Sequence, residues 1–371
     1  MSSTGRVKRL KRDIIDRHAK ADDLKAMTQV ITTLVPLALL WIAAALSVRI
    51  SLWLTVPLVG LISLFTLRVF ALMHDCGHGS LFRTCWLNRA FGFLFGVMAG
   101  MPQYVWSQHH NFHHATNGNW EKYRGPLTTL STDEYAAMTQ SKQRRYRHIR
   151  NIAVAPAGGF VYLIFNPRIT WLKGTAQLLV HLVKTKLTTP GTPLRAHAAS
   201  FQTRYWQSRK EYWHMFWNNA ALLSMVALLS WVFGTALACS IYLLSVSLAG
   251  GAGLVLFTVQ HNFEHAYASQ TQEWDFDAGT MEGTSFLILP FWLNWFTVDI
   301  AYHHVHHLSA NIPNYRLVGC HNEYQELFAD VPRLRLSQIH RAAKCILWDT
   351  RARRIISIAA YEQQLPAVPQ T

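Results

Sequence analysis

The sequence predicts an all-α membrane protein with four transmembrane helices arranged in two hairpins beneath a cytoplasmic helical cap. Half of the 371 residues are hydrophobic and only 15% are charged, which is too little charge to coat a soluble protein of this size. Four apolar stretches are long enough to cross a bilayer. In addition, most of the 19 histidines fall in four clusters rather than being scattered along the chain.

The first predicted hairpin lies near the N-terminus. The segment 27–48 contains no charged residue, and the segment 52–73 contains only Arg68, near its far end. Each segment is long enough for one transmembrane helix. Because only a few residues separate the two segments, we expect a tight turn between them.

The second predicted hairpin comprises the segments 212–233 and 236–259, joined by the uncharged pair Gly234 and Thr235. Weaker apolar stretches are marginal in length and contain Pro, Gly or Asn, so we expect buried or interfacial helices there. These stretches are residues 90–106, 152–165 and 284–298.

Basic residues predict the orientation of the spans, because Lys and Arg concentrate on cytoplasmic flanks. Eight of them precede the first span, and the two hairpin tips together hold only Arg49. We therefore expect a multi-pass protein with both termini in the cytoplasm. The predicted parts are a basic segment at 1–26, a membrane domain at 27–310 whose cap comprises 74–211 and 260–310, and a C-terminal segment at 311–371.

The formal net charge of +15 and the five cysteines allow two exclusions. Basic patches can bind nucleic acid, but the positions of these charges beside the spans explain them, so we expect no nucleic-acid partner. The cysteines are odd in number and scattered, so they predict neither a disulfide framework nor a thiolate zinc site.

The histidine clusters combine spacings that bring side chains together on a helix. Residues three and four apart share one helix face, and ionisable groups near a membrane are usually functional. We therefore predict a metal site on the cytoplasmic side. The four clusters are His74 with His78, His109 to His114, His261 with His265, and His303 to His307.

The number of histidines indicates two metals. Neutral imidazole suits zinc, copper, iron and nickel, but a structural zinc takes only four ligands. Eight or nine histidines therefore predict an all-nitrogen di-metal site held by the cap, since the carboxylate motifs of soluble di-iron bundles do not occur. We expect Asp75, Glu264 and Asp299 to orient the imidazole rings from outside the metal site.

With these residues, the region 69–309 resembles the membrane-bound fatty acid desaturases. It contains H-D-C-G-H-G-S at 74–80 and H-x-x-H-H at both 110–114 and 303–307. The resemblance implies a non-haem centre of two iron ions on four transmembrane helices. It also implies that O2 is a co-substrate and that two hydrogens are removed from an unactivated acyl chain, giving a double bond and water.

Carried over position by position, the resemblance implies nine metal ligands and no catalytic residue beyond the metal centre. His265 corresponds to a ninth ligand of acyl-CoA members, in which a water-binding Asn stands four residues earlier. This chain has His261 at that position, so the role of His261 stays open. We expect structural or outer roles for His109 and His304. The implied ligands are His74, His78, His110, His113, His114, His265, His303, His306 and His307.

Details of the motifs extend the prediction to substrate and partner. The three residues between His74 and His78 resemble acyl-lipid members, so we expect an acyl chain of a membrane lipid as substrate. No H-P-G-G haem motif occurs, so we expect a separate electron donor of the ferredoxin or cytochrome b5 type. Basic residues such as those at 142–150 are a candidate docking site for an acidic donor. The absence of an organelle address favours a bacterial inner membrane.

Two alternatives stay open. The same metal architecture serves hydroxylases, ketolases, acetylenases and sphingolipid-type desaturases. A non-catalytic metal-transport or metal-sensing site is an alternative from another class. Transport predicts ligands at mid-membrane depth, whereas these clusters lie at the ends of spans or outside them.

Overall fold

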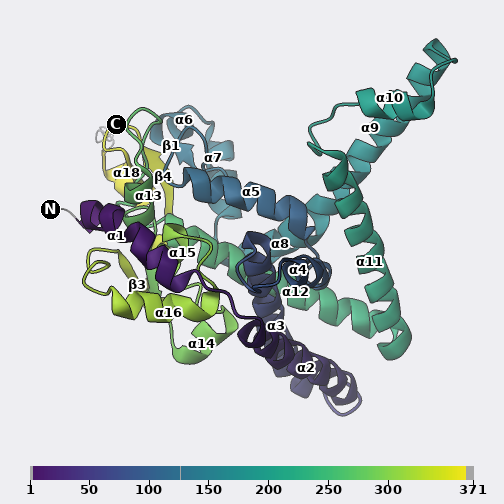
Figure 1. Cartoon of the computed structure of the whole chain (residues 1–371), viewed down its shortest axis with the longest axis horizontal. Helices are drawn as coiled ribbons and strands as arrows, with labels where there is room; N and C mark the ends of the chain where they lie inside the picture. Colours follow the sequence, from purple (N-terminus) through teal and green to yellow (C-terminus); the bar gives the residue numbers. More distant parts are fainter. Residues whose placement is uncertain (1–2, 126, 365–371) are drawn as a thin grey trace, which may run out of the picture.

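The computed structural model describes residues 3–125 and 127–364, and these are mostly helical. Figure 1 shows a bundle of long helices with a cap of shorter helices and strands at one end. Helices α1 (Ser3–His18) and α18 (Ile358–Gln364) both lie at the cap end. The predicted helical class is confirmed, although the cap also contains two small sheets that the sequence did not predict.

The long helices contain the four predicted spans. At their cap ends the helices are longer than the apolar stretches, because an apolar stretch ends where polar residues begin even when the helix continues. For example, the second helix continues beyond residue 73 and carries the first histidine cluster on its last turns. These helices are α2 (Asp23–Ser47), α3 (Leu52–His78), α11 (Arg209–Phe233) and α12 (Thr235–His261).

A fifth helical run in the described residues, Ile152–Thr188, is also long and apolar enough to cross a membrane. It comprises a 3-10 turn (Ile152–Val154), α8 (Ala155–Phe160), a π-helical turn (Val161–Phe165) and α9 (Asn166–Thr188). The apolar helices identify a membrane protein, but the count of four spans is not confirmed by helix length. The first half of this run is the stretch for which the sequence predicted a buried or interfacial helix.

Close helix contacts explain the glycines where this run crosses the bundle. Helix α8 packs against α12, and a Cβ atom on Gly159 would lie 2.2 Å from the backbone nitrogen of Gly251. Only glycine permits two helices to approach so closely. The run is therefore fixed to the bundle at α8, whereas α9 extends beyond it, as Figure 1 shows.

Arg68, the one charge in the second predicted span, connects three helices. Its side chain is only 2% exposed, its Nε donates to Thr33 Oγ1 of α2 at 2.9 Å, and its Nη1 donates to the carbonyl of Trp295 in α14 (Phe291–Phe296). The guanidinium also lies 3.8 Å from the centre of the Trp295 ring. A buried charge at this depth needs such partners, so Arg68 fixes the position of α14 beside the bundle.

The cap consists of short helices and two small sheets. In one sheet, β1 (Leu130–Ser131) is parallel to β4 (Cys345–Asp349), which is antiparallel to β5 (Arg354–Ser357). In the other, β2 (Phe286–Ile288) is parallel to β3 (Arg333–Arg335), with Phe286 opposite Arg333. The other short helices are α4 (Cys85–Ala99), α5 (Gln103–Thr116), α6 (Thr132–Ala136), α7 (Gln140–Ile149), α13 (Phe276–Met281), α15 (His303–Leu308), α16 (Asn314–Glu323) and α17 (Ile339–Ala342). Helix α10 (Leu194–Ser200) follows α9 and lies away from the cap.

Both ends of the chain pack onto the cap. Three of the five strands come from the C-terminal segment, and Trp348 of β4 stacks on Trp120 with ring centroids 4.5 Å apart. At the N-terminal end, Lys11 of α1 contacts Asp277 Oδ1 of α13 at 2.9 Å. The terminal segments therefore hold together the loops that position the histidines.

Candidate metal centre

Four helix ends bring histidines to one place between the bundle and the cap. His74 and His78 occupy the last turns of α3, which ends at Gly79 with a positive φ of 72°. This left-handed residue turns the chain away from the helix axis and leaves the final turn facing the cap. The rings of His74 and His78 lie 4.7 Å apart, as expected for a pair four residues apart on one helix face.

The two H-x-x-H-H motifs lie on α5 and α15. Helix α15 is only six residues long, and all six are buried. The backbone leading into it is tightly turned, because the non-glycine residues Val298 and Asp299 both have positive φ values. His261, the last residue of α12, completes the set.

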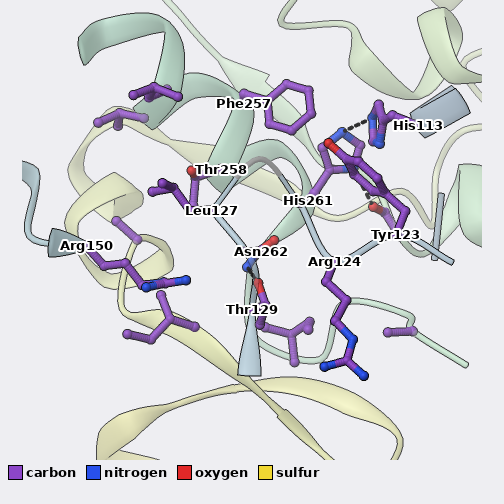
Figure 2. Close-up of a pocket in the computed structure, with 18 of the residues that line it drawn as sticks. His113, Tyr123, Arg124, Leu127, Thr129, Arg150, Phe257, Thr258, His261 and Asn262 are labelled. Carbon is purple, nitrogen blue, oxygen red and sulfur yellow. Dashed lines mark hydrogen bonds between the residues drawn. The ribbon is translucent and has the colours of Figure 1, made fainter. Parts of the chain in front are cut away.

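Nine histidines form two groups. Within each group, the nitrogen atoms available as ligands lie within 4.8 Å of one another, and both groups combine residues from the bundle and the cap. Figure 2 shows the contact between His113 and His261 in the second group. The first group is His74, His78, His110, His114 and His306, and the second is His113, His261, His303 and His307.

The nitrogen–nitrogen distances match a metal site better than a hydrogen-bonded network. His261 Nε2 lies 3.1 Å from His113 Nε2 and 2.9 Å from His303 Nε2. A ring nitrogen either donates one proton or accepts with one lone pair, so His261 Nε2 cannot satisfy both neighbours well. Nitrogens bound to one metal at about 2.1 Å lie about 3 Å apart when their bonds are perpendicular.

The first group shows the same spacing. His114 Nε2 lies 3.1 Å from His110 Nε2 and 3.0 Å from His306 Nε2. In addition, both ring nitrogens of His307 and Nε2 of His78 are buried without a hydrogen-bond partner. Buried polar atoms without partners are rare, so these nitrogens also fit a bound cation.

Burial keeps the cap histidines in the form that binds metal. Desolvation, followed by the proximity of other histidines, holds the pKa values of His110, His114 and His306 well below the ordinary value. The same causes act in that order on His113, His303 and His307. Neutral imidazole is the liganding form, and an all-nitrogen donor set suits iron, zinc, copper or nickel.

Asp75 is the carboxylate that contacts a histidine of the two groups. Its Oδ1 accepts from His74 Nδ1 at 2.9 Å, and its Oδ2 accepts from the backbone and side-chain nitrogens of Asn314 at 3.0 and 2.8 Å. A carboxylate can only accept, so Nδ1 carries the proton and Nε2 of His74 is left for a metal. This is the outer position that the sequence predicted for Asp75.

The other two predicted outer carboxylates lie elsewhere. Glu264 is exposed and lies outside both histidine groups. Burial raises the pKa of Asp299 to about 6, although the positive charge of Arg68 acts to lower it. The expected contact between Asp299 and a ligand histidine is therefore not formed among the described residues.

The structure brings together eight of the nine histidines that the resemblance implies as ligands, and adds His261. His265 is exposed, has a positive φ of 69°, and donates its backbone N–H to the carbonyl of Ile355, so it lies outside both groups. The signal for His261 was its position at the end of the apolar stretch of α12, where it extends the helix into the cap.

His109 and His304 also lie outside both groups, as expected. His304 is completely buried, and its Nε2 lies 2.8 Å from Nδ1 of His321 on α16. His321 was not singled out in the sequence, because a lone histidine has no distinctive spacing. His109 is exposed.

Two hollows border the histidine groups. One is a cavity of about 680 Å³ that touches His110 and is lined by Phe70, Trp106 and Phe257, with Gln207 and Glu211 also on its wall. This volume is typical of a ligand pocket. The other, shown in Figure 2, touches His113 and His261 and has Arg124 and Arg150 on its wall. Tyr123 and Phe257 line both hollows.

Comparisons with known proteins identify relatives over most of the chain. Residues 50–340 match the family model described as fatty acid desaturase. A protein of Bacillus subtilis named fatty acid desaturase is 30% identical over 95% of this chain and 91% of its own length. An sn-1 oleoyl-lipid 12-desaturase of Anabaena variabilis is 24% identical over 82% of this chain and 78% of its own length. An endoplasmic-reticulum omega-3 fatty acid desaturase of Vigna radiata is 24% identical over 67% of this chain and 59% of its own length.

Proposed function

Because the chain belongs to the fatty acid desaturase family of oxidoreductases, we propose that it introduces a double bond into an acyl chain of a membrane lipid. The reaction would consume O2 and two electrons from a separate donor, and two irons would be its cofactor. The observation that carries this proposal is the pair of buried histidine groups, in which neutral ring nitrogens face one another at metal-ligand spacing.

Nine histidines would hold the two irons, with His261 in place of His265. His74, His78, His110, His114 and His306 would bind one iron, and His113, His261, His303 and His307 the other. Bound iron with open coordination positions would supply O2 activation and the oxidising power needed to break an alkyl C–H bond. The protein's part is to orient the rings, which Asp75 does for His74, and to keep water away from them.

The cavity beside His110 would hold the acyl chain. Aromatic side chains form its wall next to the histidines, and Trp106 stacks on His110 with ring centroids 4.5 Å apart. Phe257 lies 5.0 Å from the ring of His113 and lines the same cavity. An apolar wall that contacts ligands of both groups would exclude water and hold one stretch of the chain beside the irons.

The first histidine motif and one relative support a lipid-linked substrate. The spacing of His74 and His78 resembles acyl-lipid members, and the Anabaena relative carries the words oleoyl-lipid in its name. We further propose that the electron donor is acidic and docks on α7, where Lys142, Arg144 and Arg147 are exposed. Charge complementarity of this kind steers transient complexes.

The proposed setting is the bacterial inner membrane, with four spans and both termini in the cytoplasm. The basic residues that flank α2 and the scarcity of charge at the hairpin tips support this orientation. Reporter fusions near residues 20, 50, 235 and 365 test it. A signal from the external side at residue 20 or 365 would contradict the orientation.

The substrate assignment is tested by supplying membranes with labelled acyl-phospholipid or labelled acyl-CoA, together with reductant and O2, while transacylation is blocked. We expect new double bonds in the phospholipid pool, located by mass spectrometry. Double bonds that appeared only in the CoA pool would remove the lipid assignment. A hydroxylated product without an alkene would move the enzyme to the hydroxylases of the same architecture.

A further inference from the structure

Helix α9 and the segment that follows it form an arm that leaves the bundle. Figure 1 shows α9 and α10 projecting away from both the bundle and the cap. The arm consists of residues 166–208. At its base, Arg168 donates to Asn218 Oδ1 of α11 at 2.7 Å and to the carbonyl of Leu163 at 3.1 Å. Its base is therefore fixed beside the first half of α11.

One side of α9 is covered by the returning chain. His181 Nε2 lies 3.1 Å from the carbonyl of His197, and Thr203 Oγ1 donates to Gln177 Oε1 at 3.3 Å. Trp206 lies so close that a Cβ atom on Gly174 would be 2.1 Å from its ring. The residues after α10, up to the start of α11, form neither helix nor strand.

This return path argues against α9 as a membrane span, despite its length and hydropathy. Irregular backbone exposed to lipid leaves its polar groups unsatisfied in the hydrocarbon core. The return path consists of α10, only seven residues long, and irregular chain that carries Arg195 and Arg204. The arm begins beside Asn218 in the first half of α11 and ends directly before α11, so both of its ends lie along that half of the helix and the arm does not cross the bilayer.

The opposite side of α9 carries an exposed apolar stripe. Leu172, Leu179, Val180, Val183 and Leu187 recur at helical spacing and are 53 to 77% exposed. Side chains at these intervals share one face of a helix. Ala176, which is also exposed, continues the stripe. Such a face is unfavourable in water and needs a covering.

The charges around the stripe indicate what covers it. Lys173 and Lys184 are exposed along α9, and residues 135–210 contain no Asp or Glu at all. An apolar stripe with lysines beside it and no acidic residue is the pattern of a helix that lies in the membrane surface, with its cations on anionic headgroups. A second copy of this chain would present the same positive charge and be repelled.

We propose that the arm lies in the cytoplasmic membrane surface, with its apolar stripe below the headgroups and its lysines on the phosphates of anionic lipids. The base of the arm adjoins the cavity beside His110, because Leu163 before the arm and Gln207 at its end both line that cavity. The arm therefore holds the lipid surface at the cavity. This membrane contact is independent of the reaction at the histidines, so its test needs no activity.

The test measures the depth of two labels on the full chain in nanodiscs. A fluorophore is attached to Val183→Cys on the stripe or to Thr188→Cys, an exposed position on another side of α9, after replacing Cys85 and Cys239 with Ser. We expect spin-labelled acyl chains to quench the label at 183 severalfold more than the label at 188. We expect acrylamide in the water to quench them in the opposite order.

The lipid requirement is tested in the same samples. Shielding of the label at 183 should fall when phosphatidylglycerol is replaced by phosphatidylcholine, or when Lys173 and Lys184 are both changed to Gln. Equal exposure of both labels to acrylamide would overturn the proposal, as would disulfide cross-linking of two chains through Val183→Cys. Shielding that did not depend on anionic lipid would overturn the headgroup contact. Labelling of Thr188→Cys in cells by an impermeant reagent from outside would show a spanning helix instead.

Discussion

Replacing Asp75 with Asn should weaken metal binding while changing the volume of the side chain very little. Asp75 is 2% exposed, and its two oxygens accept from His74 Nδ1 and from two nitrogens of Asn314. An Asn side chain has one acceptor and one donor group. Whichever way the amide turns, its NH2 group faces a donor, either His74 Nδ1–H or the nitrogens of Asn314.

The size of the effect follows from those contacts. One arrangement loses the bond that orients His74, and the other loses both bonds to Asn314. Loss of an outer partner of a metal-binding histidine typically costs about 10- to 100-fold in metal affinity, which corresponds to about 1.4 to 2.8 kcal/mol. We expect the lower end where the amide keeps its oxygen on His74, and the upper end where it does not.

The assay is a titration of bound iron against a chelator, performed on the purified full chain in detergent or nanodiscs. Glu264→Gln is the matched control, because Glu264 was also predicted as an outer carboxylate but is exposed and outside both groups. Asp75→Asn should release iron at about 10- to 100-fold lower chelator concentration than the unchanged chain, and Glu264→Gln should match the unchanged chain. Unchanged iron affinity in Asp75→Asn, or a loss of affinity in Glu264→Gln, would show that Asp75 does not orient a metal-binding histidine.

Three further predictions follow from the cavity, the buried histidines and Arg68. Gly253→Leu should fill the cavity beside His110 and abolish most activity while leaving the iron content unchanged. The control Gly60→Leu, at an exposed glycine of α3 with open space around it, should leave activity unchanged. Product analysis and metal analysis measure both effects, and full activity of Gly253→Leu would exclude the cavity as the acyl site. Burial lowers the pKa values of His110 and His306, so below about pH 6.5 the unfolded chain binds more protons than the folded protein. Both the melting temperature and the amount of bound iron should therefore decline as the pH falls from that value through the lowered pKa values. A melting temperature that rose on acidification would contradict this prediction. Arg68→Met should remove the contacts to Thr33 and Trp295 and lower the melting temperature, measured by thermal unfolding in detergent, by several degrees. An unchanged melting temperature would argue against Arg68 as a connection between helices.

Helix positions were predictable where one physical signal dominates. Apolar runs identified α2, α3, α11 and α12, because a span must be apolar along its whole length. The same signal was ambiguous for Ile152–Thr188, since a helix that lies in the membrane surface also carries apolar residues. The strands of the cap were missed because they are two to five residues long and pair with distant segments.

The histidine site was predictable to the extent that its ligands are close in sequence. The spacings on α3, α5 and α15 identified eight of the nine histidines that the structure places in the two groups. The choice between His261 and His265 depends on where α12 ends, which spacing does not reveal: the helix stops at His261, and the turned backbone that follows carries His265 away. The outer contacts of Asp75 depend on Asn314, which is 239 positions away.

The metal content of two histidine variants shows whether His261 or His265 holds an iron. Iron per chain is measured by mass spectrometry on the purified protein and on His261→Ala and His265→Ala, alongside double-bond formation in labelled phospholipid. Two histidine groups predict about two irons per chain in the unchanged protein and in His265→Ala, with desaturation retained. His261→Ala should lose the iron of the second group, and with it the activity. Full iron and activity in His261→Ala would exclude His261 as a ligand, and stoichiometric zinc in place of iron in the active protein would exclude the di-iron centre.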